Sequence, residues 1–199
     1  MYLCPYDTSW ILAQRSSIAA MKLTEAEGDL SNVMRMLWEQ HIAWTRMTII
    51  SIIKDLPDVD FVTQRLLQNP TDFKIVLQHF YGNEIASKFA ELFKSHLVIA
   101  AQLVKAAKAG YTKEAEETEK KWYANADEIA AFLVKINPYW SFDNWRTMLY
   151  EHLKMTKSEA VNILTNNYKK SITDYDEIEK QALKMADVMA EGIVKQLLY

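Results

Sequence analysis

The sequence predicts an all-α protein, an antiparallel helical bundle of the ferritin-like or a similar type, built from repeated helix pairs. Apolar residues recur at spacings of three and four along nearly the whole chain, which is the period of helices that bury one face. The 199 residues include only four glycines and four prolines, so little interrupts long helices. No segment shows the alternation of a strand, and the short connections favour antiparallel neighbours.

Capping and helix-breaking residues set the limits of each predicted helix. Ser31 can cap the first one, Pro70 and Pro138 each follow an asparagine at a predicted end, and Gly110 suits a left-handed C-terminal position. A further break is expected at Gly82. The predicted helices span residues 31–54, 58–67, 72–79, 83–109, 112–136, 141–165 and 172–197.

Composition limits the domain organisation and the classes of partner. Residues 1–28 have weak periodicity and are interpreted as a loosely attached N-terminal segment, followed by one bundle domain at 29–199. The net charge of −3 argues against a nucleic acid partner. Cys4 is the only cysteine, no apolar run could span a bilayer and no signal peptide is evident. We therefore expect a cytoplasmic protein without a membrane partner.

Three of the four histidines occur in one local context. His41 lies in LWEQHI, His96 in LFKSHL and His152 in LYEHL. In each case the apolar spacing places the imidazole on the inward face of a helix. A buried imidazole needs a hydrogen-bond partner or a metal ion, so these rings are candidate functional groups.

The pattern suggests a metal site in the bundle core. Glu159 shares the inward stripe of His152, and a buried carboxylate is almost never unpaired. Imidazole and carboxylate ligands from facing helices suit iron, manganese or zinc. The candidate metal ligands are His41, His96, His152 and Glu159, with Asp127 and Asp187 as further ligands or as acceptors that orient the rings.

Two other hypotheses remain open. The histidines could be hydrogen-bonded core residues of a non-enzymatic structural or interaction protein, for instance a homodimer. Alternatively, Glu159 beside a histidine could perform acid–base chemistry, although we expect an enzyme less than a binding protein. No Glu-x-x-His pair occurs, which counts against a ferritin-type diiron centre. Nucleotide binding is not expected because the chain has no glycine-rich phosphate loop.

An internal repeat supports the helix pairs. A histidine helix is followed by RLLQNP in the first unit and by FLVKINP in the second. NADEIAAF, which contains Asp127, matches MADVMAEG, which contains Asp187, so these two residues are predicted to be equivalent. Arg46 lies between apolar residues, and two interpretations of it stay open. It could pair with an inward carboxylate such as Asp127 or Asp187, or its side chain could extend along the surface to solvent.

A resemblance to known proteins rests on six segments: LWEQHIAWTRMTIIS, LPDVDFVTQRLLQNPTDF, FYGNEIASKFAELFKSHLVIAAQLVKAAKAG, INPYWS, LYEHLKMT and ALKMADVM. In these segments the chain resembles a family of uncharacterised, small all-helical proteins of spore-forming bacteria. Members are often labelled acetylglutamate kinase, but that activity needs phosphate-binding loops, which this sequence lacks. The resemblance also extends distantly to helical-bundle metalloproteins of unknown function, which implies buried histidines in duplicated units.

Overall fold

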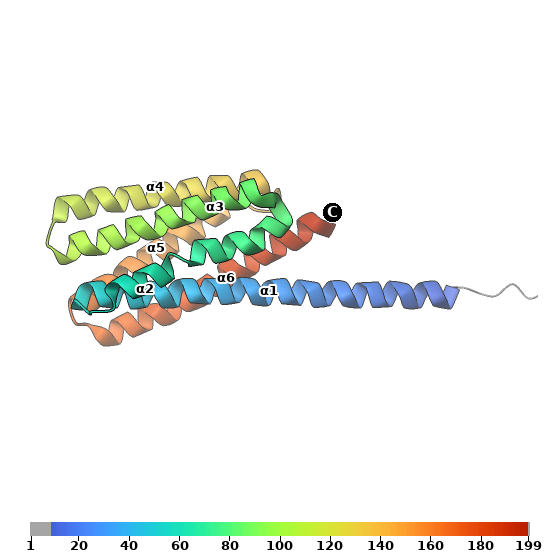
Figure 1. Ribbon diagram of the computed structural model, residues 1–199, viewed down its shortest axis with the longest axis horizontal. Coiled ribbons are helices and arrows are strands. Elements are labelled where there is room, and N and C mark those ends of the chain that lie inside the picture. Colours follow the sequence, from blue (N-terminus) through green and yellow to red (C-terminus); the bar gives the residue numbers. More distant parts are fainter. Residues whose placement is uncertain (1–8, 199) are drawn as a thin grey trace, which may run out of the picture.

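The computed structural model describes the chain from residue 9 to residue 198, with side chains from residue 25 onward. It confirms an all-α helical bundle, and the described residues form no strand. The ferritin-like arrangement itself stays a prediction. The helices are α1 (Ser9–Lys54), α2 (Val59–Leu66), α3 (Asn69–Lys108), α4 (Thr112–Ile136), α5 (Phe142–Leu164) and α6 (Tyr168–Leu198) (Figure 1).

Helix α3 consists of two segments that meet at Gly82. Gly82 has φ 78° and ψ 167°, a conformation that strongly favours glycine, and the chain bends back sharply there (Figure 1). Residues 69–81 and 83–108 therefore run in opposite directions. The predicted break at Gly82 is confirmed, and it lets the second segment begin a new helix pair.

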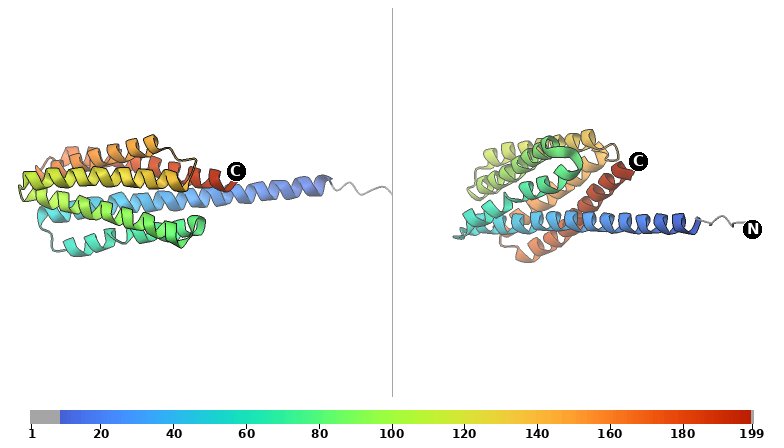
Figure 2. Two further views of the ribbon diagram at one scale, coloured as in Figure 1. Left: turned by 90° about the horizontal axis from the view of Figure 1, so that it is seen from above. Right: turned by 45° about the vertical axis from the view of Figure 1, so that its right-hand side comes forward.

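The helices form three consecutive hairpins. The first hairpin pairs α1 with α2 and residues 69–81, the second pairs residues 83–108 with α4, and the third pairs α5 with α6. The first helices of the three hairpins run in one direction and the returning helices in the other (Figures 1 and 2). Because α6 also packs against α1, the third hairpin contacts the first.

Several predicted helix limits are correct and others are not. Ser141 caps α5 and accepts a hydrogen bond from the Asn144 amide at 3.4 Å, as expected. Ser31, by contrast, is not a cap, because α1 continues without a break from Ser9. Helix-favouring residues on both sides of Ser31 outweigh its capping preference. The helix predicted to end before Asn69-Pro70 does so, since α2 ends at Leu66. Pro70 itself lies in the first turn of α3, a position that proline fits, so the next helix begins earlier than expected.

The N-terminal part of α1 extends past the other helices (Figure 1). Cys4 lies outside the described residues, and the separate status of residues 1–28 stays a prediction. None of the helices in the described range is both long and apolar enough to cross a membrane. The core lies between the hairpins, and its largest fully buried side chains include Trp145, Phe73, Phe89, Met34, Leu77 and Leu133.

Candidate functional site: a buried histidine layer

Three histidines from three different hairpins meet in the core. His41 lies on α1, His96 on the second segment of α3 and His152 on α5, and each is at most 3% exposed. The ring centroids of His41 and His152 are 5.5 Å apart. All three rings line one void of about 10 Å³, together with aromatic and aliphatic side chains. We call His41, His96 and His152 the histidine layer.

A carboxamide side chain holds His96 from the returning helix of its hairpin. The oxygen of Asn125 lies 3.0 Å from Nδ1 of His96. The Nδ2 group of Asn125 donates to the carbonyl oxygen of Leu92, one turn before the histidine, at 3.2 Å. Because the amide nitrogen has its own acceptor, the oxygen must face the ring, and Nδ1 of His96 carries the proton.

The third hairpin repeats this arrangement with glutamine. Oε1 of Gln181 lies 3.2 Å from Nδ1 of His152, and Nε2 of Gln181 donates to the carbonyl oxygen of Met148 at 2.6 Å. Met148 again lies one turn before the histidine. The sequence separation of histidine and carboxamide, 29 residues, is the same in both hairpins.

The first hairpin contains an incomplete copy. Asn69 follows His41 at nearly the same spacing, and its Nδ2 donates to the carbonyl oxygen of Leu37 at 3.0 Å. Leu37 lies one turn before His41, as in the other hairpins. However, Nδ1 of His41 and Oδ1 of Asn69 are both buried without a hydrogen-bond partner among the described residues. The His41 ring is therefore the one of the three whose orientation no hydrogen bond at Nδ1 fixes within the described part of the chain.

Burial keeps all three imidazoles neutral. Desolvation lowers the pKa of His96 to about 3 and that of His152 to about 4. Desolvation also lowers the pKa of His41 well below its ordinary value, and the two neighbouring histidines add to this effect. With the proton on Nδ1 of His96 and His152, their Nε2 atoms carry lone pairs, which is the form in which imidazole binds a metal ion.

Glu159 is buried as predicted, but it pairs with an arginine instead of a histidine. It is 2% exposed and accepts a hydrogen bond from Arg46, whose guanidinium also lies 5.2 Å from the ring centre of Tyr175. Burial raises the pKa of Glu159 to about 7, and Arg46 only partly opposes that rise. Arg46 therefore pairs with an inward carboxylate, as one of the two interpretations expected, but its partner is Glu159 and not Asp127 or Asp187.

The structure places Asp127 and Asp187 away from the histidine layer. Asp127 accepts hydrogen bonds from Arg146 at 2.8 Å and from Tyr150 at 3.0 Å, and Asp187 accepts from Arg35 at 2.6 Å. Their side chains are 40% and 44% exposed. Neither aspartate orients a histidine ring. Carboxamides on other faces of α4 and α6 orient the rings of His96 and His152.

The repeat alignment is also corrected. The repeated carboxamides make Asn69, Asn125 and Gln181 equivalent, whereas the alignment of NADEIAAF with MADVMAEG is shifted by one helical turn. A one-turn shift preserves the apolar face, so periodicity alone could not detect it. Asn137, in the second Asn-Pro, instead donates to the Tyr81 hydroxyl at 2.9 Å. A carboxamide that recurs 28 or 29 residues after each of the three histidines is the sequence signal that indicates the correct register.

In the described part of the chain, no three or more His, Cys, Asp and Glu side chains already form a group able to hold a metal ion. The histidine layer is thus a set of neutral nitrogens around a small void and not a closed cage. Comparisons with protein-family models, with curated proteins and with solved structures found no match to this chain.

Proposed function

We propose that this protein binds a transition-metal ion in its core through His41, His96 and His152. The observation that supports the proposal most is the repeated carboxamide contact, which fixes the tautomer of two rings and leaves Nε2 as the basic nitrogen. Outer hydrogen bonds of this kind commonly orient metal-binding histidines. The low histidine pKa values also favour binding, because no proton has to be displaced at neutral pH.

The dimensions of the layer suit a single ion. The void of about 10 Å³ has room for roughly one water-sized sphere. Two imidazoles bound to one ion at about 2.0–2.1 Å would have ring centres roughly 5 Å apart. The observed distance between His41 and His152 is 5.5 Å. Since the three rings do not form a closed cage, binding includes a rearrangement of the rings around the void.

The ligand set narrows the choice of metal. The ligand set predicted from the sequence included carboxylates, and such a set suits iron, manganese or zinc. With Glu159, Asp127 and Asp187 engaged by arginines, only imidazole nitrogens remain, and these suit zinc, copper, iron or nickel better than manganese. Three neutral protein ligands would leave a position open on the ion, where it could bind and polarise an oxygen ligand. A reducing cytoplasm is the location that we propose for this activity.

The alternative is that the histidines serve only as hydrogen-bonded core residues of a structural or homodimeric protein. Elemental analysis of protein purified without a histidine tag separates the two. We expect about one equivalent of metal per chain in the parent protein, and loss of that metal in His41→Gln, His96→Gln and His152→Gln.

His79 provides the matched control, since it is the fourth histidine and lies exposed on α3. The His79→Gln variant should retain the full metal content. If the parent protein contains no metal, and if its melting temperature does not respond to added zinc, iron(II), copper or nickel, the metal proposal is wrong and the structural alternative stands.

A further inference from the structure

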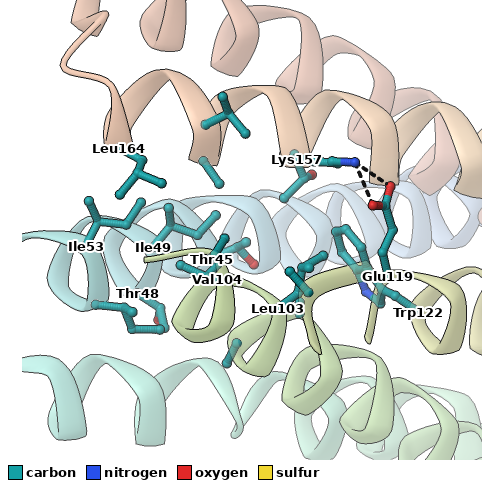
Figure 3. Close-up of a pocket in the computed structure, with 18 of the residues that line it drawn as sticks. Thr45, Thr48, Ile49, Ile53, Leu103, Val104, Glu119, Trp122, Lys157 and Leu164 are labelled. Carbon is teal, nitrogen blue, oxygen red and sulfur yellow. Dashed lines mark hydrogen bonds and ion pairs between the residues drawn. The ribbon is translucent and has the colours of Figure 1, made fainter. Parts of the chain in front are cut away.

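A larger cavity lies beside the histidine layer. It has a volume of about 200 Å³ and is bounded by the C-terminal parts of α1, α3 and α5 and by the start of α4 (Figure 3). The residues one turn after His41, His96 and His152 are Thr45, Ala100 and Thr156, and all three line it. The cavity therefore lies one helical turn beyond the histidine layer, along the same three helices.

Trp122 connects the two regions. Its ring centre lies 5.3 Å from that of His96, and its side chain also lines the cavity (Figure 3). Small side chains leave this space open, because alanines occupy positions at which larger side chains would fill it. The five alanines in the lining are Ala100, Ala101, Ala107, Ala115 and Ala160.

The lining excludes most charged ligands. Lys157 is the only cation among the lining residues, and it donates to the carboxylate oxygens of Glu119 at 2.7 and 2.6 Å (Figure 3). This ion pair joins α5 to α4. The remaining charged lining residue is Glu116, which would repel an anion. A carboxylate-bearing ligand would therefore find no counter-ion, and burying it would be costly.

The size and the apolar walls indicate the class of occupant. An apolar protein cavity of about 150 Å³ stays dry and binds benzene, so a cavity of about 200 Å³ has room for a slightly larger molecule. We propose that this cavity binds an uncharged, mainly hydrocarbon small molecule about as large as a substituted benzene ring, with one end beside the histidine layer. This proposal does not depend on the presence of a metal ion.

Three probes of similar size but different charge test the proposal: ethylbenzene, benzoate and benzylamine. Thermal unfolding and titration calorimetry are measured on the full chain, both after treatment with a chelator and after incubation with zinc. Ethylbenzene should raise the melting temperature in proportion to the logarithm of its concentration once it exceeds the Kd. Benzoate should not, because the one lining cation, Lys157, is already paired with Glu119. Protonated benzylamine should bind more weakly than ethylbenzene, because its charged group would lose water on entering a mainly apolar cavity. Binding of ethylbenzene to the chelator-treated protein would support the cavity even if no metal binds.

Ala100→Leu fills the cavity and should weaken ethylbenzene binding at least tenfold. Ala90→Leu is the matched control, because Ala90 lies on the same helix but does not line the cavity, and it should keep the parent Kd. Ala160→Leu replaces Ala100→Leu if that variant fails to fold. The proposal is overturned if ethylbenzene does not bind, if the charged probes bind equally well, or if a folded cavity-filling variant keeps the parent Kd.

Discussion

A carboxamide that accepts a hydrogen bond from an imidazole fixes both the orientation and the tautomer of that ring. Asn125 and Gln181 do this for His96 and His152, and each also donates to a backbone carbonyl on the histidine helix. The sequence was sufficient to identify the buried histidines, because they share one apolar context. It was not sufficient to identify their partners, because asparagine and glutamine on a helix are more often exposed.

Replacing Gln181 with leucine tests this positioning at the level of one residue. Loss of the acceptor leaves the buried Nδ1 of His152 without a partner and removes the second hydrogen bond to the carbonyl oxygen of Met148. We therefore expect the free energy of unfolding to fall by about 1–3 kcal/mol. If the layer binds a metal ion, its affinity should also fall by roughly 10- to 100-fold. Denaturant unfolding and metal titration measure the two effects.

Gln196→Leu is the control for this change, since Gln196 is exposed and its amide donates to the carbonyl oxygen of Ile136. It should alter the free energy of unfolding by no more than about 0.5 kcal/mol. A Gln181→Leu protein as stable as the control would show that the carboxamide does not hold the ring.

Glu159 provides a pH-dependent prediction. Its folded-state pKa is raised to about 7, so the folded state holds this proton more tightly than the unfolded state. The stabilisation is present below the ordinary pKa near 4.5 and is lost as the pH rises to about 7. The parent protein should therefore lose stability relative to Glu159→Gln across that interval. A difference between the two proteins that stays constant from pH 4.5 to 7 would contradict the prediction.

The helices show where local sequence signals are decisive. The helix ends next to Gly110 and Asn137 were predicted correctly, because glycine and the Asn137-Pro138 pair both disfavour continuation of a helix. The start at Ser31 was wrong because a capping residue within a strongly helical stretch does not end the helix. A close approach between helices, by contrast, leaves little trace in a single sequence. Gly192 is an example, since nothing in MADVMAEG shows that an indole lies against it.

Gly192→Ala should destabilise the third hairpin. An added Cβ would overlap the indole ring of Trp140, which is buried and donates to the carbonyl oxygen of Val188 at 3.1 Å. We expect a loss of about 1–3 kcal/mol in the free energy of unfolding, as is typical of overpacking. Thermal and denaturant unfolding measure the change.

Gly28→Ala is a matched control on α1, where an added Cβ meets no atom within 4 Å. Because alanine favours a helix more than glycine does, this variant should be more stable by roughly 0.5–1 kcal/mol. If both substitutions shift stability in the same direction, the Trp140 contact does not limit the size of residue 192.

At the scale of the whole molecule, three hairpins each contribute one histidine to a shared interior. The sequence indicated the repeat of histidine helices, and their parallel arrangement follows because the chain reverses direction both within and between the hairpins. It did not indicate the cavity of about 200 Å³, because alanines on an inward stripe do not reveal whether facing side chains fill the space between them. That depends on how the three hairpins meet.

The shared interior makes stability sensitive to acid. In metal-free protein, His41, His96 and His152 stay neutral in the folded state while they protonate in the unfolded state below pH 6.5. Each should lower the free energy of unfolding by about 1.4 kcal/mol per pH unit as the pH falls from about 6 towards 4. Each single glutamine variant should remove one such contribution from the measured slope, and His79→Gln should leave the slope unchanged. Equal slopes in all of these proteins would contradict the burial of the three rings.

The incomplete carboxamide contact of the first hairpin has a consequence for how the interior could adapt. Two of the rings are anchored at Nδ1, whereas the imidazole of His41 and the amide of Asn69 each retain an unused hydrogen-bonding atom. A metal ion that enters the core would therefore meet two rings that are held by a hydrogen bond at Nδ1 and one ring that no described residue holds in this way. The adjustment to ions of different radius should therefore fall mainly on the ring of His41, which packing against Trp38 and Phe93 holds without a hydrogen bond at Nδ1 to the described part of the chain.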